Sequence, residues 1–233
     1  NLLFKNPMVS SSSLRFIYTV VALLVLLAEG LSNNWLLYTA KPLLIPILFI
    51  WSAFTPDARL LKRKGLFLIA LFFAFLGDTL LMLRGLFLPG LASFLLMQWG
   101  YSLVFWPEAS RSKLKSKHIY VALVIVYMTI FIGFLLGKVN DALMRIALPI
   151  YGLSIGTMLI ISLLRDVASA SYLRVAIGAL LFTISDSLIA YNRFVESVPM
   201  AGIWIMSTYM LAQYLIVAGV LKKGGDTRMV APL

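Results

Sequence analysis

Two aspartates lie deep inside long apolar stretches: Asp78 within residues 65–83 and Asp186 within residues 173–191. A carboxylate in membrane hydrocarbon costs at least about 2.5–3.5 kcal/mol, so such residues usually face a protein interior or a water-filled cavity and serve function. When two carboxyl groups lie close together in a low dielectric, one keeps its proton while the other is charged. Such a pair suits a reaction that protonates a substrate and activates water, and it equally suits proton-coupled transport.

Other polar side chains are expected in the same leaflet as the aspartates. Lys41 and Gln98 lie about two and three turns into their stretches, and Arg193 follows Asp186 by two helical turns on the same face. Each also has a purely structural interpretation. Lys41 can pair with an aspartate, Gln98 and Gln213 can join helices by hydrogen bonds, and Arg193 can anchor to headgroups. The aspartates themselves can be hydrogen-bonded packing contacts.

Several enzyme classes lack their required residues here. The chain has no Cys and a single His, His118, so a cluster of His or Cys ligands for zinc is excluded. Intramembrane aspartyl proteases need G-x-G-D, but Phe75 stands where the first glycine belongs before Gly77-Asp78. A serine hydrolase would need G-x-S-x-G and a His base, and Ser185 has neither.

The composition places these residues in a membrane protein. Of 233 residues, 61% are hydrophobic and 12% charged, and the mean hydropathy is +0.96, which excludes an ordinary soluble enzyme, a disordered chain and a disulfide scaffold. A helix needs about 20 apolar residues to cross the bilayer. We therefore predict an all-α fold in one integral membrane domain, residues 1–233, with eight transmembrane helices at about 14–30, 35–54, 65–83, 87–106, 119–137, 142–164, 173–191 and 198–221.

The basic residues predict the orientation. With both termini in the cytoplasm, only Arg84, Lys138, Arg145 and Arg193 fall outside and Lys41 lies within a span, while the other fifteen of the 20 Lys and Arg residues fall inside. An excess of cytoplasmic basic residues sets topology, so we predict N-in and C-in. The net charge of +11 then reflects cytoplasmic loops and anionic headgroups rather than nucleic acid. A bacterial inner membrane is the expected location.

The two halves of the chain resemble each other. Gly77-Asp78-Thr79-Leu80-Leu81 is similar to Ser185-Asp186-Ser187-Leu188-Ile189, and Phe94–Gln98 is similar to Tyr209–Gln213. These pairs predict an internal repeat of residues 14–106 and 119–221, although Leu-rich helices also look alike by chance. Four helices in each half would make the repeat parallel, and sites tend to lie between such halves. The repeat would bring Asp78 and Asp186 together.

The same residues carry a resemblance to the YhhN family, whose characterised members are lysoplasmalogenases. The matching pieces, in order along the chain, are Lys41-Pro42, Gly77-Asp78-x-x-Leu81, Gly178-Ala179-Leu180-Leu181-Phe182-x-Ile184-Ser185-Asp186-Ser187 with Phe194, and Tyr209-x-x-Ala212-Gln213. The family often has a His before a Tyr in the fourth span. Here Gln98 takes that place before Tyr101.

The resemblance implies hydrolysis of the vinyl ether of a lysoplasmalogen to a fatty aldehyde and a glycerophospho-choline or -ethanolamine. It implies Asp78 and Asp186 as catalytic acid and base, with neither role assigned to either residue, and no metal or cofactor. The partners would be the lysolipid and membrane lipids. Residues expected to bind substrate are Lys41, Gln98, Tyr101, Ser185, Arg193 and Gln213. The alternatives are a proton-coupled transporter and a non-catalytic lipid-binding member, the latter suggested by Gln98.

Overall fold

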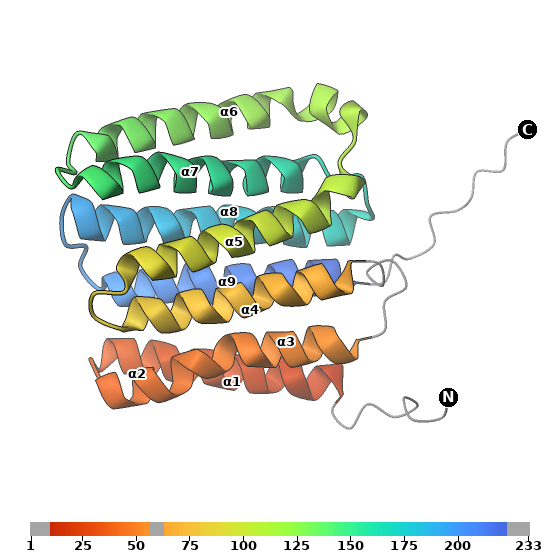
Figure 1. Cartoon of the computed structure of the whole chain (residues 1–233). Helices are drawn as coiled ribbons and strands as arrows, with labels where there is room; N and C mark the ends of the chain where they lie inside the picture. Colours follow the sequence, from red (N-terminus) through yellow and green to blue (C-terminus); the bar gives the residue numbers. More distant parts are fainter. Residues whose placement is uncertain (1–9, 56–62, 223–233) are drawn as a thin grey trace, which may run out of the picture.

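The computed structural model describes residues 10–55 and 63–222, and its regular elements there are helices (Figure 1). Among these described residues, the helices form eight spans long and apolar enough to cross a membrane, as predicted. The elements are α1 (Ser11–Gly30), α2 (Asn34–Ala40), η1 (Lys41–Leu43), α3 (Leu44–Phe54), α4 (Lys64–Met82), α5 (Phe87–Phe105), η2 (Trp106–Glu108), α6 (Arg111–Leu136), α7 (Ala142–Leu163), α8 (Ser169–Phe194) and α9 (Ala201–Val220).

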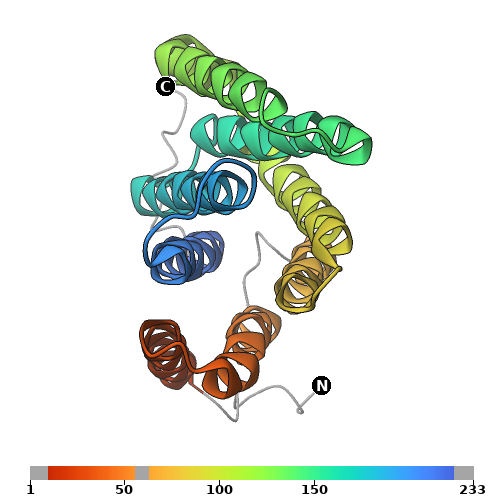
Figure 2. The same cartoon turned by 90° about the vertical axis from the view of Figure 1, so that its left-hand side faces the viewer.

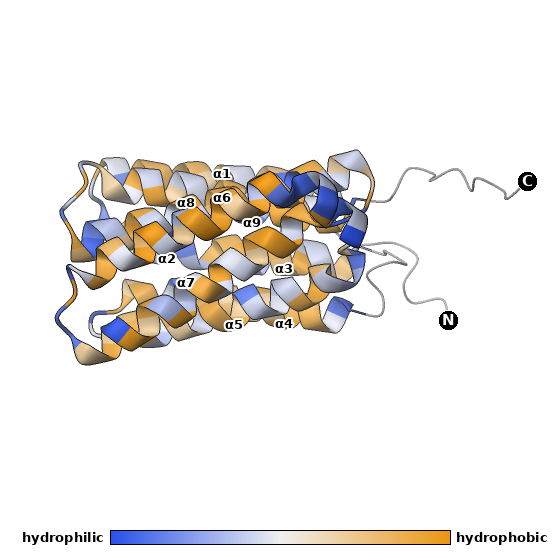
Figure 3. Ribbon diagram, turned by 90° about the horizontal axis from the view of Figure 1, so that it is seen from above, coloured by the Kyte–Doolittle hydropathy of each residue, from blue (hydrophilic) through white to orange (hydrophobic). Residues whose placement is uncertain are grey.

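The outer surface of the bundle is apolar around its middle and polar at its ends (Figure 3). Large side chains such as Phe16, Ile130 and Leu153 are about two-thirds exposed. In water an apolar surface of this extent would be unstable, whereas in a bilayer it contacts lipid tails. Helices suit that environment because they satisfy their own backbone hydrogen bonds.

The first and last described residues lie at the same end of the bundle (Figure 1). The amino end of α6, which carries Arg111, Lys113, Lys115 and Lys117, lies at this end too. This arrangement agrees with the grouping of basic residues in the topology prediction; which face of the membrane this end occupies stays a prediction. Five basic residues of that prediction lie outside the described residues: Lys5, Arg59, Lys62, Lys223 and Arg228.

The second span differs from its prediction because it is broken. Residues 35–54 were expected to form one helix, but a 3-10 turn at Lys41–Leu43 separates α2 from α3. Pro42 has no N–H to continue the α-helical ladder and its ring crowds the preceding turn. Pro46 adds a second missing donor one turn later. The break places Lys41 at an irregular point inside the span, where interrupted membrane helices commonly form ion or substrate sites.

The helices pack most extensively in two pairs, α4 with α5 and α8 with α9. α6 lies at one edge of the bundle and α1, α2 and α3 at the opposite edge (Figure 2). Two Gly-x-x-x-Gly motifs, Gly133–Gly137 at the carboxyl end of α6 and Gly152–Gly156 in α7, differ in how closely they pack. A Cβ on Gly152 would lie 2.4 Å from Ile132 Cδ1 of α6, whereas one on Gly133 would meet nothing within 4 Å. Only the Gly152 motif therefore brings two helices close together.

Gly178 sets the close approach of α8 to α9. A Cβ there would lie 2.9 Å from the Ala212 carbonyl oxygen and 3.0 Å from the Ile216 backbone nitrogen. We expect Gly178→Ala to destabilise the protein by about 1–3 kcal/mol, because backbone atoms cannot move aside as a side chain can. Thermal unfolding in detergent measures this loss. Gly133→Ala is the matched control, and equal melting temperatures for the two variants would contradict the expectation.

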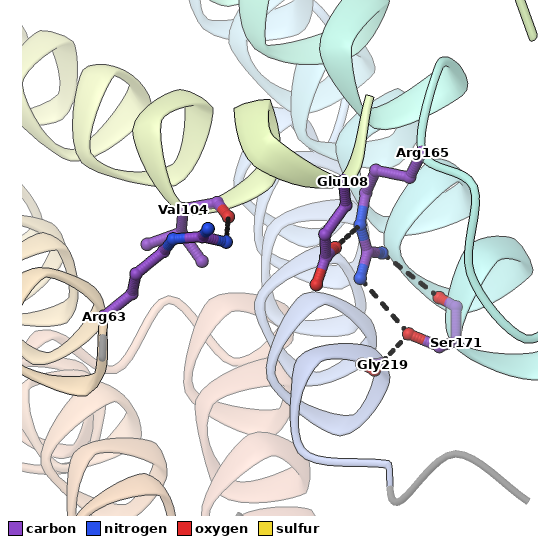
Figure 4. Close-up of polar contacts among 6 residues, drawn as sticks. All are labelled: Arg63, Val104, Glu108, Arg165, Ser171 and Gly219. Carbon is purple, nitrogen blue, oxygen red and sulfur yellow. Dashed lines mark hydrogen bonds and ion pairs between the residues drawn. The ribbon is translucent and has the colours of Figure 1, made fainter. Parts of the chain in front are cut away.

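A buried ion pair joins elements at the end of the bundle where the chain's described ends lie (Figure 4). Arg165, only 2% exposed, donates from Nε to Glu108 Oε2 at 2.6 Å. Its other nitrogens donate to Ser171, whose hydroxyl donates to the Gly219 carbonyl oxygen at 2.7 Å. The network thus ties η2 to the α7–α8 connection, the start of α8 and the end of α9.

Candidate active site

Asp186, in the carboxyl-terminal half of α8, lies on the wall of an apolar cleft. Its Oδ2 accepts a short hydrogen bond from the Tyr151 hydroxyl of α7. The same oxygen accepts from Gln98 Nε2 of α5 at 3.4 Å. The carboxyl group is therefore held by two helices of the core while its own helix presents it to the cleft.

The cleft is narrow, with a cavity volume of about 50 Å³, and it is partly open to the surroundings. Helices α4 to α8 contribute its walls, and most of the lining side chains are aliphatic or aromatic, among them Leu91, Phe94, Phe131, Ile155 and Phe194. A cavity of this kind suits a hydrocarbon chain with one polar group to be recognised. Among the described residues that line the cleft, Asp186 is the one with a carboxyl group.

Asp78 is buried behind the cleft rather than on it. It is 3% exposed, and its Oδ2 accepts a hydrogen bond of 2.6 Å from the Tyr209 hydroxyl of α9. The ammonium group of Lys41, at the break in the second span, lies within electrostatic range of this carboxyl group. Phe94 packs edge-on against the Tyr209 ring and also lines the cleft. Phe94 therefore contacts both the empty space and the tyrosine that holds Asp78.

The two carboxyl groups lie within electrostatic range of each other. Within the described residues, no hydrogen bond joins them directly. Asp78 interacts with Lys41 from its own predicted half and accepts a hydrogen bond from Tyr209 of the other half. Asp186 mirrors this, with a tyrosine of α7 from its own half and the glutamine of α5 from the other. This exchange of partners is what a site between two repeats would look like, and the repeat itself stays a prediction.

Three other predicted site residues lie away from the cleft wall. The Tyr101 hydroxyl donates to Gln213 Oε1 at 2.7 Å, and Gln213 Nε2 contacts Met97 Sδ at 3.3 Å, all fully buried. Ser185 donates to the Ile205 carbonyl oxygen at 3.1 Å and joins α8 to α9. The structure therefore does not bring these three hydroxyl and amide groups to the cleft.

Arg193 lies beside the cleft near the end of α8. Its guanidinium carbon is 3.8 Å from the centre of the Phe87 ring and 5.8 Å from that of Phe194. Both rings line the cleft. The side chain is exposed, so its charge remains accessible to a headgroup while the rings hold it in place.

Gln98 has an unused acceptor next to Asp186. Its Oε1 is buried and has no hydrogen-bond partner among the described residues. An unpaired buried carbonyl oxygen costs free energy, so it calls for a donor that the protein does not supply. A water molecule or a substrate hydroxyl would satisfy it.

The two tyrosines that hold the carboxyl groups were not predicted as site residues. Tyr209 is part of the family motif, but its role at Asp78 depends on a partner 131 residues away. Tyr151 gives a weaker signal: it is a polar-tipped residue inside the sixth span whose hydroxyl must find a partner when buried. Neither partner can be identified from the spacing of residues along the chain.

The YhhN family matches residues 36–220, a segment that holds both aspartates, Lys41, Gln98 and Arg193. The chain belongs to the YhhN family. The resemblance predicted from the sequence motifs is thereby confirmed. Membership covers all spans from the second to the eighth.

Mammalian relatives of this YhhN-family chain are similar along most of their length. The lysoplasmalogenase TMEM86B of Sus scrofa is 29% identical over 207 residues, which is 86% of this chain and 82% of that protein. The protein of the same name from Mus musculus is 29% identical over 191 residues, 81% of this chain and 76% of that protein. That of Homo sapiens is 30% identical over 151 residues, 63% of this chain and 59% of that protein. No solved structure matches the chain.

Proposed function

We propose that this protein hydrolyses the vinyl ether bond of lysoplasmalogens, releasing a fatty aldehyde and glycerophosphocholine or glycerophosphoethanolamine. The observation that carries the proposal is the Asp186 carboxyl group on the wall of an apolar cleft, with Asp78 in electrostatic range. The names of the relatives support the same substrate class.

The position of Arg193 fits a lysolipid bound with its phosphate at the mouth of the cleft. Arg193 lies seven residues after Asp186 in one continuous helix, a rise of about 10 Å. A phosphate at the guanidinium group would place the glycerol between the two residues and the vinyl ether beside the carboxyl group. A guanidinium fork binds phosphate oxygens well because it donates in parallel.

Asp186 acts first as the acid and then as the base in the chemical steps. Protonated Asp186 donates its proton to the β-carbon of the vinyl ether, and the double-bond electrons form the new C–H bond, which leaves an oxocarbenium ion. A water molecule adds to the cationic carbon and gives a proton back to the Asp186 carboxylate. The hemiacetal then collapses to the aldehyde and the alcohol of the glycerophospho group. Glycosidases stabilise a similar cation with paired carboxyl groups.

The remaining polar groups have supporting roles in this proposal. The Asp78 carboxylate stabilises the developing cation from its buried position behind the cleft wall, where the low dielectric strengthens the interaction. Lys41 supplies the positive charge that balances Asp78 when no cation is present. The unpaired Gln98 Oε1 accepts a hydrogen bond from the attacking water and orients it. Tyr151 fixes the direction of the Asp186 carboxyl group.

The direct test is aldehyde release by the purified protein in nanodiscs. We expect turnover of 1-alkenyl-glycerophosphocholine or -ethanolamine and none of the 1-alkyl analogue, which has no double bond to protonate. Absence of turnover for both headgroups would contradict the proposal. In that case, proton-driven solute flux in liposomes would favour a transporter, and saturable lysolipid binding without flux would favour a lipid-binding protein.

A further inference from the structure

A second apolar space lies mainly against the amino-terminal halves of α6 and α8 and the carboxyl-terminal end of α7. This groove has a volume of about 590 Å³ and is widely open to the surroundings. Its walls include Leu123 and Tyr127 of α6, Leu163 of α7, and Ile177 and Leu180 of α8. Because these side chains face the bilayer, hydrocarbon rather than water must fill the groove.

The groove adjoins the cleft that holds Asp186. Thr183 of α8 lines both spaces. At the same level the Tyr127 hydroxyl, on the groove side, donates to Ser187 Oγ, on the cleft side, at 2.7 Å. This hydrogen bond fixes the separation of α6 and α8 at the junction. The two spaces therefore lie next to each other along the seam where α6, α7 and α8 pack.

The dimensions of the seam match one hydrocarbon chain. Ile177 precedes Asp186 by nine residues on the same helix, which is about 13 Å. A chain that fills one leaflet is about 15 Å long, half of the ~30 Å hydrocarbon core. A chain whose first carbons lie at Asp186 and which runs away from Arg193 would therefore end beside Ile177.

We propose that the groove binds the hydrocarbon chain of the lysolipid whose vinyl ether lies at Asp186. This inference rests on the proposed function for the identity of the lipid and adds to it the path of the chain. The groove then selects chains by length, because a longer chain must continue past Ile177 and a shorter one leaves that part empty. A lipid with two chains would leave its second chain outside the seam.

A phospholipid of the opposite leaflet is the alternative occupant of the groove. At its far end the Lys117 ammonium group lies 5.1 Å from the centre of the Tyr120 ring and 5.8 Å from that of Tyr172. A phospholipid of the opposite leaflet could place its phosphate there and its chain in the same groove. The two occupants run in opposite directions, so an experiment that reports direction separates them.

Photo-labelling measures this direction without any turnover. The probes are two 1-alkyl lysophosphatidylcholines, which have no vinyl ether to cleave, with a diazirine either at the chain end or beside the glycerol. We expect the chain-end probe to label α8 near Ile177 and Leu180, and the glycerol-side probe to label near Asp186. Glycerol-side labels near Lys117, or labels spread evenly over lipid-facing residues such as Ile130, would overturn the proposal.

Chain selectivity is the second readout. In Ile177→Trp the indole fills the end of the groove, so the ratio of rates for long-chain to short-chain lysoplasmalogen should fall at least about tenfold. Ile130→Trp, an exposed isoleucine of α6 outside the groove, should leave the ratio unchanged. An unchanged ratio in Ile177→Trp would overturn the chain path even if aldehyde is released. Correct labelling without aldehyde release would instead retain the groove and reject the hydrolase.

Discussion

Replacing Asp186 by asparagine should lower the rate of aldehyde release by at least about 100-fold, because general acid–base catalysis contributes about 10² to 10⁴. The substitution keeps the shape of the side chain and an oxygen that can accept from Tyr151, so the cleft should be retained. Asparagine cannot donate the proton that the vinyl ether needs. The measurement is the aldehyde formed per minute by equal amounts of folded protein.

Two companion variants make the result specific. Asp78→Asn should also lose most activity, since it removes the charge that stabilises the cation. Asp166→Asn should keep full activity. Asp166 is exposed, and among the described residues its ion pair is with Lys113 at 3.3 Å. Full activity of either Asp78→Asn or Asp186→Asn would end the two-carboxyl mechanism.

The second large effect concerns stability. Glu108→Gln should lower the free energy of unfolding by at least about 2 kcal/mol, because it removes the negative charge facing the buried Arg165 guanidinium. Breaking a fully buried pair costs about 3–5 kcal/mol. We expect a smaller loss than this here because the Glu108 side chain is 29% exposed and Arg165 keeps its hydrogen bonds to Ser171. Thermal unfolding in detergent, read by tryptophan fluorescence, measures the loss.

Comparison with a surface ion pair isolates the effect of burial. Asp166→Asn makes the same chemical change where the side chains are 54% and 36% exposed, and it should cost less than about 1 kcal/mol. The double variant Arg165→Met, Glu108→Leu should recover much of the stability, since a buried ion pair replaced by apolar groups is often neutral. A Glu108→Gln protein as stable as the Asp166→Asn protein would show that the network in Figure 4 contributes little.

The sequence best predicted the number of transmembrane spans, because each span depends on the combined hydropathy of many residues. Each span is a run of about 20 apolar residues, so the number of spans did not depend on any single position. Asp78 and Asp186 stood out for the opposite reason, since a single charge in an apolar run is costly enough to require an explanation. Helix ends were less certain: α6 begins at Arg111 rather than near residue 119, because its polar first turns are still helical.

What the sequence could not show are the contacts between distant residues. Arg165 looked like any basic loop residue, and only its packing against Glu108, 57 residues away, shows that it is buried. Ser185 adjoins Asp186 in sequence, yet successive helical residues point in different directions and its hydroxyl faces α9. Pro42 is visible in the sequence, yet the second span was predicted as one helix and the 3-10 turn at Lys41–Leu43 was not expected.

Because Asp186 and Arg193 share one uninterrupted helix, the interval between them cannot adjust to whatever lies across it. Loops adapt to a ligand; a membrane-embedded α-helix with all its backbone bonds made does not. In the proposed reaction, the pair would act as a molecular ruler set at about 10 Å. A lipid whose scissile bond is displaced from its phosphate by an additional atom or two would present the wrong carbon, and would be spared for reasons of distance rather than of charge or shape.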